Sequence, residues 1–235
     1  MKPDYHVAWY NRGNALRNLG RGEEAIASYD KALEIKPDYH VAWNNRGTAL
    51  RNLERGKEAI ASYDKALEIK PDYHVAWNNR GKALDDLGRG EEAIASYDKA
   101  LKIKPDYHVT WYNRGKALDD LGRGEEAIAS YDKALKIKPD YHVAWYNRGK
   151  ALGKLGRLEA AIASYDKALE IKPDDDATFY NQACSYALNG QIDQAIQNLQ
   201  QAIDLNPDEY REMAKSDSDF DSIRSHTRFQ ALIQE

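Results

Sequence analysis

The sequence has little of what marks several large classes of protein. Its one cysteine, Cys184, cannot close an internal disulfide or build a thiolate metal site, so we expect a small buried residue. No apolar run approaches the about 20 residues that a membrane helix needs. With 34 Lys and Arg against 38 Asp and Glu, the chain lacks the positive excess typical of nucleic-acid binding. We therefore expect a soluble protein with no membrane and no nucleic acid among its partners.

Signals for export and for catalysis are also missing. The opening residues, Met1 to His6, contain no apolar stretch of a secretion signal, which favours a cytoplasmic protein. No Gly-rich phosphate loop, no HExxH pair and no Ser-His-Asp order occurs. The histidines of the repeated part recur once every 34 residues, too far apart to converge on one metal ion: His6, His40, His74, His108 and His142. We expect no enzyme activity, no metal site and no cofactor.

What the sequence does contain is a repeat. All its prolines fall 34 residues apart, at Pro3, Pro37, Pro71, Pro105, Pro139, Pro173 and Pro207. A fixed period of this length indicates stacked supersecondary units. With His6 as position 1 of each unit, the division is 6–39, 40–73, 74–107, 108–141, 142–175 and 176–209. Residues 1–5 are then the remnant of a preceding repeat end, and 210–235 form a tail.

Each unit is predicted to contain two helices. In the first unit, Trp9 and Leu16 recur at helical spacing before the break at 20–22. Glu23 then stands near the start of a second helix, where the positive end of the helix dipole favours an acid. Pro37 ends that helix, because proline cannot continue the hydrogen-bond ladder.

These residues resemble a known family. The set of Trp9, Gly13, Leu16, Ala25, Tyr29, Ala32 and Pro37 is similar to the signature of the tetratricopeptide repeat (TPR) family. The sixth unit is looser, with Phe179 in the tryptophan position and Ala183 in the glycine position. The resemblance implies an all-α fold, a right-handed superhelical solenoid of antiparallel helix pairs whose first helices line a concave groove. It also implies a non-enzymatic scaffold for protein binding.

The chain departs from the family pattern in two places. A position that is usually bulky in the family is Gly22, Gly56, Gly90 and Gly124 in the first four units, which predicts looser turns there. Glu54 replaces the turn glycine found in the other units. The tail 210–235 resembles the closing segment of many bacterial, especially cyanobacterial, TPR arrays. We interpret it as a cap over the last helix pair, with a short helix from Ser225.

The candidate binding surface follows from differences among otherwise near-identical units. At about 100° per residue, positions 5, 6, 9, 12 and 13 of each first helix fall opposite the packing arc. Three of them, 9, 12 and 13, take three residue types across five units, which favours diversification of a binding groove. Free drift of solvated positions is the alternative. The candidates at position 9 are Asn14, Lys82, Lys116 and Lys150, at position 12 Arg17, Arg51, Asp85 and Asp119, and at position 5 Tyr10, Asn44, Asn78, Tyr112, Tyr146 and Tyr180.

Position 6 is asparagine in every unit: Asn11, Asn45, Asn79, Asn113, Asn147 and Asn181. Such a ladder of amides could pair with the backbone of an extended peptide. The alternative is pairing with the neighbouring repeat or with water. The carboxylate clamp of the family requires lysines and an arginine that positions 2, 5 and 6 do not provide, so clamp-type binding is disfavoured.

The sequence therefore predicts a scaffold that binds an extended peptide or partner segment in its groove. The alternatives are a self-assembling structural module and an excised or engineered array without its own ligand. The start at Lys2-Pro3-Asp4-Tyr5 matches a repeat end, as though a preceding unit had been cut away. It leaves the first packing surface open, so a weak homodimer through the N-terminal repeat is also expected.

Overall fold

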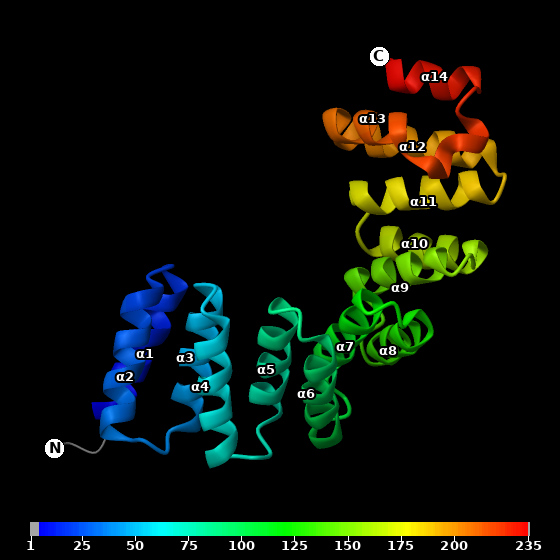
Figure 1. Ribbon diagram of the computed structural model, residues 1–235. Coiled ribbons are helices and arrows are strands. Elements are labelled where there is room, and N and C mark those ends of the chain that lie inside the picture. The colour runs from blue at the N-terminus through cyan, green and yellow to red at the C-terminus, as the bar shows by residue number, and fades with distance from the viewer. Residues whose placement is uncertain (1–4, 235) are drawn as a thin grey trace. The chain divides into compact units, whose positions relative to one another are not determined.

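The computed structural model describes residues 5–234, and all regular structure in that range is helical (Figure 1). Residues 1–4 of the predicted remnant 1–5 lie outside the described residues, and Tyr5 begins the first helix. The helices are α1 Tyr5–Asn18, α2 Gly22–Ile35, α3 His40–Asn52, α4 Gly56–Ile69, α5 His74–Asp86, α6 Gly90–Ile103, α7 His108–Asp120, α8 Gly124–Ile137, α9 His142–Lys154, α10 Leu158–Ile171, α11 Asp176–Leu188, α12 Ile192–Leu205, α13 Pro207–Ser216, the 3-10 helix η1 Ser218–Ile223, and α14 Thr227–Gln234.

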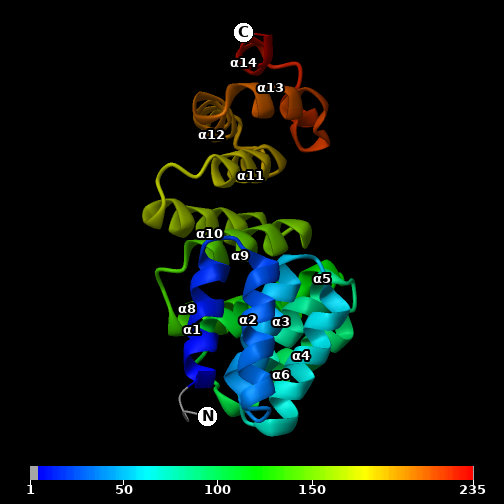
Figure 2. The same cartoon turned by 90° about the vertical axis from the view of Figure 1, so that its left-hand side faces the viewer.

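The helices form two compact units, Met1–Leu121 and Gly122–Glu235. In the first unit each helix from α1 to α7 packs on the next, and α1, α3, α5 and α7 also contact one another in succession. In the second unit α10, α11 and α12 follow one another as successive layers (Figures 1 and 2). These contacts confirm the prediction of an all-α stack of consecutive helix pairs. No helix within residues 5–234 is long and apolar enough to cross a membrane.

The helix ends lie where the punctuating residues predict them. In the first pair, Gly20 adopts a φ of +74°, which closes the turn between α1 and α2. In the second pair, Glu54 adopts nearly the same conformation with a φ of +60°, and no other non-glycine residue within 5–234 has a positive φ. The turn therefore keeps its shape at Glu54 at the cost of a conformation that side chains disfavour.

The signature residues make the contact between the two helices of a pair. In the first pair, Ala25, Tyr29 and Ala32 are completely buried. A Cβ atom added to Gly13 would lie 2.6 Å from the Tyr29 ring, so only glycine allows the helices this approach. The same glycine-on-tyrosine contact recurs at Gly47 and Gly81 in the first unit and at Gly149 in the second.

An arginine connects each helix pair to the preceding pair. Arg46 donates from Nε to Asp30 on α2 at 2.6 Å and from Nη1 to Ser62 on α4 at 2.8 Å. Its guanidinium also lies 5.8 Å from the ring of Trp43, whose Nε1 donates to the carbonyl of Pro37 at 2.9 Å. Arg80 and Arg148 repeat this set of contacts, and Gln182 reaches Asp166 in the last pair. In the sixth repeat, the most divergent one, the side-chain amide of Gln182 therefore replaces the arginine in this contact.

The glycines at the start of the second helices are covered by leucines. A Cβ added to Gly22 would lie 3.0 Å from the methyl groups of Leu53, the last turn residue of the following first helix. Leu87 packs against Gly56 in the same way, Leu121 packs against Gly90, and Leu155 packs against Gly124. These turns are packed, so the looser turns expected from the sequence are not found at these glycines.

The C-terminal segment folds back on the last helix pair. Phe220 on η1 and Phe229 on α14 are completely buried, and their ring centroids lie 5.4 Å apart. They share one core with Tyr180 and Leu199 of the last pair. The short helix expected from Ser225 begins two residues later, at Thr227.

Candidate binding surface on the first helices

We call the side chains at positions 5, 6, 9, 12 and 13 of the first helices the first-helix face. In the first unit it belongs to α1, α3, α5 and α7, and in the second to α9 and α11. Most of the predicted residues on it are half-buried or exposed: Tyr10, Asn11, Asn14, Arg17, Asn45, Arg51, Asn79, Lys82, Asp85, Tyr112, Lys116, Asp119, Tyr146, Asn147, Lys150 and Asn181. Four are buried and offer a partner little surface: Asn44, Asn78, Asn113 and Tyr180.

The asparagines of the first unit bind one another instead of presenting a free ladder. Asn113 Nδ2 donates to Asn78 Oδ1 at 3.0 Å, and Asn79 Nδ2 donates to Asn44 Oδ1 at 3.0 Å. Asn44 in turn donates to Asn45 Oδ1 at 3.1 Å. The chain of amides ends where Asn45 donates to Tyr10 Oη at 3.0 Å and to Asn14 Oδ1 at 2.9 Å.

This chain of amides changes how position 6 is interpreted. Asn45, Asn79 and Asn113, predicted to pair with a peptide backbone, donate to position 5 of the preceding first helix, so for these three the pairing is with the neighbouring repeat. Asn147 donates to the Val143 carbonyl of its own helix. In the second unit Asn181 does the same, donating to Tyr146 Oη at 3.2 Å and to the Ala177 carbonyl at 2.8 Å. The asparagines thus fix the spacing of adjacent first helices.

Charged residues on the first-helix face of the first unit pair both between neighbouring first helices and within one helix. Lys116 Nζ lies 3.2 Å from Asp85 and 2.9 Å from Asp120, and Arg51 Nε lies 3.5 Å from Asp86. Burial opposes the charge of Lys116, but its hydrogen bonds to the two aspartates raise its pKa overall. Burial and the charge of Arg51 lower the pKa of Lys82. The surface therefore carries both charge signs, as the sequence indicates.

Each unit has a hollow that includes residues of this face. In the first unit a pocket of about 490 Å³ is lined by Arg51, Asn52, Asp86 and Leu87, together with turn residues. In the second unit a pocket of about 290 Å³ is lined by Lys150, Gly153, Lys154, Tyr165, Asn181, Cys184, Ser185, Leu188 and Asp219. Sequence reasoning pointed to Arg51, Lys150 and Asn181 but missed Tyr165, Cys184 and Asp219. A tail that folds back over α11 brings Asp219 into the pocket, and no local pattern predicts that contact.

Tyr180 is covered by the C-terminal segment. It is 4% exposed, stacks on Tyr210 at 5.0 Å and meets Phe220 edge-on at 5.7 Å. Its hydroxyl donates to Asp217 at 2.7 Å. In this structure, therefore, Tyr180 holds the tail in place and is not accessible to a peptide.

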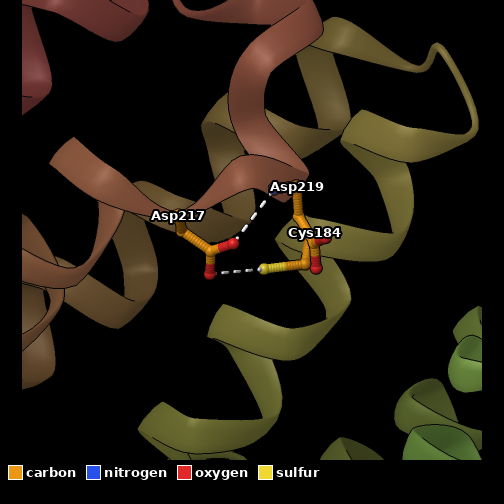
Figure 3. A group of neighbouring side chains, drawn as sticks. All are labelled: Cys184, Asp217 and Asp219. Carbon is orange, nitrogen blue, oxygen red and sulfur yellow. Dashed lines mark hydrogen bonds between the residues drawn. The ribbon is translucent and has the colours of Figure 1, made fainter.

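Cys184, Asp217 and Asp219 form the one cluster within residues 5–234 whose ligand atoms lie close enough together for a metal ion (Figure 3). The thiol faces Asp217 at 3.8 Å, and the other oxygen of Asp217 accepts the backbone N–H of Asp219 at 3.0 Å. Burial, with the two nearby carboxylates, raises the pKa of Cys184, so the thiol stays protonated. Because Asp217 caps η1 and accepts from Tyr180, the cluster is explained as the anchor of the C-terminal segment.

Comparisons with known proteins agree with the resemblance seen in the sequence. Two family models, both described as tetratricopeptide repeat, match residues 6–39, 40–73, 74–107 and 177–209, and residues 112–176. Among curated proteins, none matches this chain.

Three solved structures illustrate the similarity of fold. YrrB, described as a TPR protein with an unusual peptide-binding site, is 25% identical over 77% of this chain and 93% of its own, with a TM-score of 0.67. PilF of Pseudomonas aeruginosa is 22% identical over 91% of this chain and 98% of its own, with a TM-score of 0.77. TTC0263, a thermophilic TPR protein of Thermus thermophilus, is 24% identical over 77% of this chain and 98% of its own, with a TM-score of 0.61.

Proposed function

Because the chain belongs to the tetratricopeptide repeat family, we propose that it is a scaffold that binds an extended segment of a protein partner on its first-helix face. Proteins of this fold generally bind other proteins and are generally not enzymes. In this proposal the six repeats between 6 and 209 form the scaffold, and 210–235 close its last helix pair.

One observation carries the proposal. The pocket of about 490 Å³ in the first unit and the pocket of about 290 Å³ in the second each include residues at the positions that vary among the repeats, whereas the packing positions are nearly invariant. Arg51, Asn52 and Asp86 supply these positions in the first unit, and Gly153 and Lys154 supply them in the second. Free drift would also change solvated second-helix positions such as Asp30 and Lys31, which are the same in the first five repeats. The description of YrrB, which names a peptide-binding site, favours the same interpretation for a similar chain.

The geometry also limits which residues would touch a peptide. Buried Asn44, Asn78, Asn113 and Tyr180 position their neighbours and are not proposed as direct contacts. Tyr112 and Tyr146 are half-buried and offer aromatic surface beside charged groups, the combination on which binding hot spots commonly form.

Selection of displayed random peptides on the immobilised full chain tests the proposal. We expect bound peptides with both charge signs, and Tyr112→Ala combined with Tyr146→Ala should weaken a selected peptide about tenfold or more by calorimetry. Circular dichroism should stay near that of the unmodified chain. The matched control is Lys65→Ala with Glu68→Ala, an exposed ion pair on α4, which should leave affinity unchanged. Equal affinity for both variants would refute the assignment of the face.

A second proposal, weak self-association through α1, rests on a different observation. Ala42 and Ala49 on α3 are buried by the preceding helix pair, whereas Ala8 and Ala15 at the same positions of α1 are exposed. An apolar face of this kind can pack on a second copy. Sedimentation over a hundredfold range of concentration tests this, and Ala15→Glu should abolish any dimer. A chain that stays monomeric at the highest concentration would exclude it.

A further inference from the structure

One side of α1 is left largely uncovered at the end of the first unit (Figure 1). This side, which we call the outer face of α1, consists of Ala8, Trp9, Arg12, Ala15 and Leu19. Ala8 and Ala15 are exposed, whereas the alanines at the same positions of α3 and α5 are at most 1% exposed. Leu19 is 72% exposed, against 36–42% for the equivalent leucines of the next three repeats. The outer face shares no residue with the first-helix face.

The packing of α4 on α5 shows what such a face accepts. Leu67 on α4 shares a buried core with Ala76 on α5, and Trp77 packs against the same core. One turn further along α5, Arg80 donates from Nε to Asp64 on α4 at 2.7 Å. The covering helix therefore supplies a leucine for the alanine and an aspartate for the arginine.

A third contact sets the direction of the covering helix. Leu87, directly after α5, packs on Gly56 at the start of α4, where a Cβ would lie 3.0 Å from a Leu87 methyl group. Successive residues of α5 thus meet α4 in the reverse order, so the two helices run antiparallel. Read along the covering helix, the pattern is a glycine, an aspartate eight residues later, and a leucine three residues after the aspartate.

On α1 the equivalent arginine has only some of these partners. Arg12 donates from Nη1 to Ser28 at 2.7 Å, and its guanidinium lies 5.4 Å from the ring centroid of Trp9. Arg46 and Arg80 make the same two kinds of contact and also bind a carboxylate through Nε. Within residues 5–234 no carboxylate binds Nε of Arg12. The outer face therefore presents apolar surface around one cationic donor that an acid can satisfy.

We infer that the outer face of α1 binds an α-helix of a partner protein, antiparallel to α1, that carries the glycine, aspartate and leucine of α4 at the same spacing. This goes beyond the proposed function, because it adds a second binding surface. The leucine covers Ala8, the aspartate binds Arg12, and the glycine leaves room for Leu19. Charge-assisted hydrogen bonds are about twice as strong as neutral ones, so the aspartate sets the register of the partner helix.

A second copy of this chain offers no such helix. Because α1 contains no aspartate or glutamate, α1 packed on α1 leaves Arg12 without a carboxylate. In α12, the last second helix, Ile192 and Gln200 stand where α4 has Gly56 and Asp64. The other second helices within residues 5–234 already pack on the first helix that follows them. A partner helix should therefore displace any weak dimer that forms through α1.

A peptide copy of α4 tests the outer face directly. The peptide spans Gly56–Ile69, with Ala61→Glu joined to Lys65 by a lactam bridge, because both positions are exposed on α4 and a free peptide of this length is a marginal helix. The full chain, labelled with ¹⁵N, is titrated with it. We expect saturable shifts of the outer-face amide resonances, and a nitroxide at the N-terminus of the peptide should broaden Leu19 more than Ala8. Shifts confined to the first-helix face, or the reverse order of broadening, would overturn the inference.

A double-mutant cycle isolates the ion pair. Asp64→Asn in the peptide, or Arg12→Gln in the chain, should each weaken binding about tenfold. The two changes together should cost little more than either alone, and additive losses would contradict the assigned pair. Ala15→Glu in the chain should abolish binding. The matched control, Lys31→Ala with Glu34→Ala in an exposed ion pair on α2, should leave it unchanged.

Two further measurements separate this inference from the other proposals. Sedimentation of the chain with saturating peptide should show monomer with one bound peptide, whereas a dimer that persists at saturation assigns the outer face to a second copy and overturns the inference. Tyr112→Ala with Tyr146→Ala, which tests the first-helix face, should bind the α4 peptide as tightly as the unmodified chain. If the α4 peptide does not bind, this inference falls and the proposed function stands. If it binds but peptide selection fails, the outer face stands and the proposed function falls.

Discussion

Alanine in place of Gly81 should destabilise the first unit, although alanine is the better helix former. Gly81 lies in α5 directly over the ring of Tyr97 on α6. A Cβ at this position would come within 2.5 Å of Cε1 and 2.7 Å of Cδ1. The ring is 1% exposed and cannot swing into solvent. The two helices must therefore separate, or the ring must leave its preferred rotamer.

The size of the effect is a difference of two opposing terms. Overpacking of a well-packed core costs about 1–3 kcal/mol, whereas replacing a helical glycine by alanine gains about 0.5–1 kcal/mol. The net expectation for Gly81→Ala is a loss of roughly 1–2 kcal/mol in the free energy of unfolding. Urea denaturation followed by circular dichroism at 222 nm measures it directly.

Gly153→Ala is the matched control, since it makes the same chemical change where there is room. Its Cβ would meet only Ser185 Oγ at 3.9 Å, so only the helix-propensity gain of about 0.5–1 kcal/mol should remain. The two variants should therefore shift the urea midpoint in opposite directions. A midpoint of Gly81→Ala at or above that of the unmodified chain, or equal losses in both variants, would refute the reasoning.

Three further predictions concern the contacts that join the helices. Arg80→Ala should lower the free energy of unfolding by about 1.5–3 kcal/mol in urea titration, because it removes the hydrogen bonds to Asp64 and Ser96. Arg80→Gln should lower it less, because Gln182, at the equivalent position of the last repeat, still donates to Asp166. Phe229→Ala, at a completely buried site, should cost about 3–5 kcal/mol locally, and limited proteolysis should then release α14 first. Burial lowers the pKa values of His40 and His74 below their ordinary 6.5. Near that pH the unfolded chain therefore binds more protons than the folded chain, so the urea midpoint should fall as the pH drops through about 6.5. The midpoint should fall less in the double variant His40→Gln, His74→Gln.

The fold could be predicted from the sequence because its signals are local and repeated. The break at 20–22 and the proline at 37 bound a helix pair, and α1 and α2 end within two residues of those points. Gly13 and Tyr29 identify the contact inside the pair, since a signature of small and large residues leaves one way to pack two helices. Repetition of the period then gives the order of the stack.

The side-chain pairing on the candidate surface could not be predicted in the same way. Helical geometry places Asn44 and Asn78 on the arc opposite the packing face, but it does not show that the next first helix covers them. Pairing of Asn79 with Asn44 depends on how adjacent repeats are offset, a distance that no single repeat encodes. Leu53 likewise fills the space at Gly22 from the following repeat, so that glycine looks like a gap only when one repeat is considered alone.

Because the first five repeats are nearly identical, the chemical effect of each residue that differs between them can be considered separately. Where position 9 is Asn14 or Thr48, the hydroxyl of the tyrosine below it forms a hydrogen bond to that residue. In the fifth repeat position 9 is Lys150, and Gly153 one turn later leaves space beside it in the pocket that both residues line. Because the packing residues stay constant, such substitutions change what the surface offers without altering the stack that presents it. A repeat array can therefore change the lining of a pocket through two or three residues of one first helix while the packing between its helices stays the same.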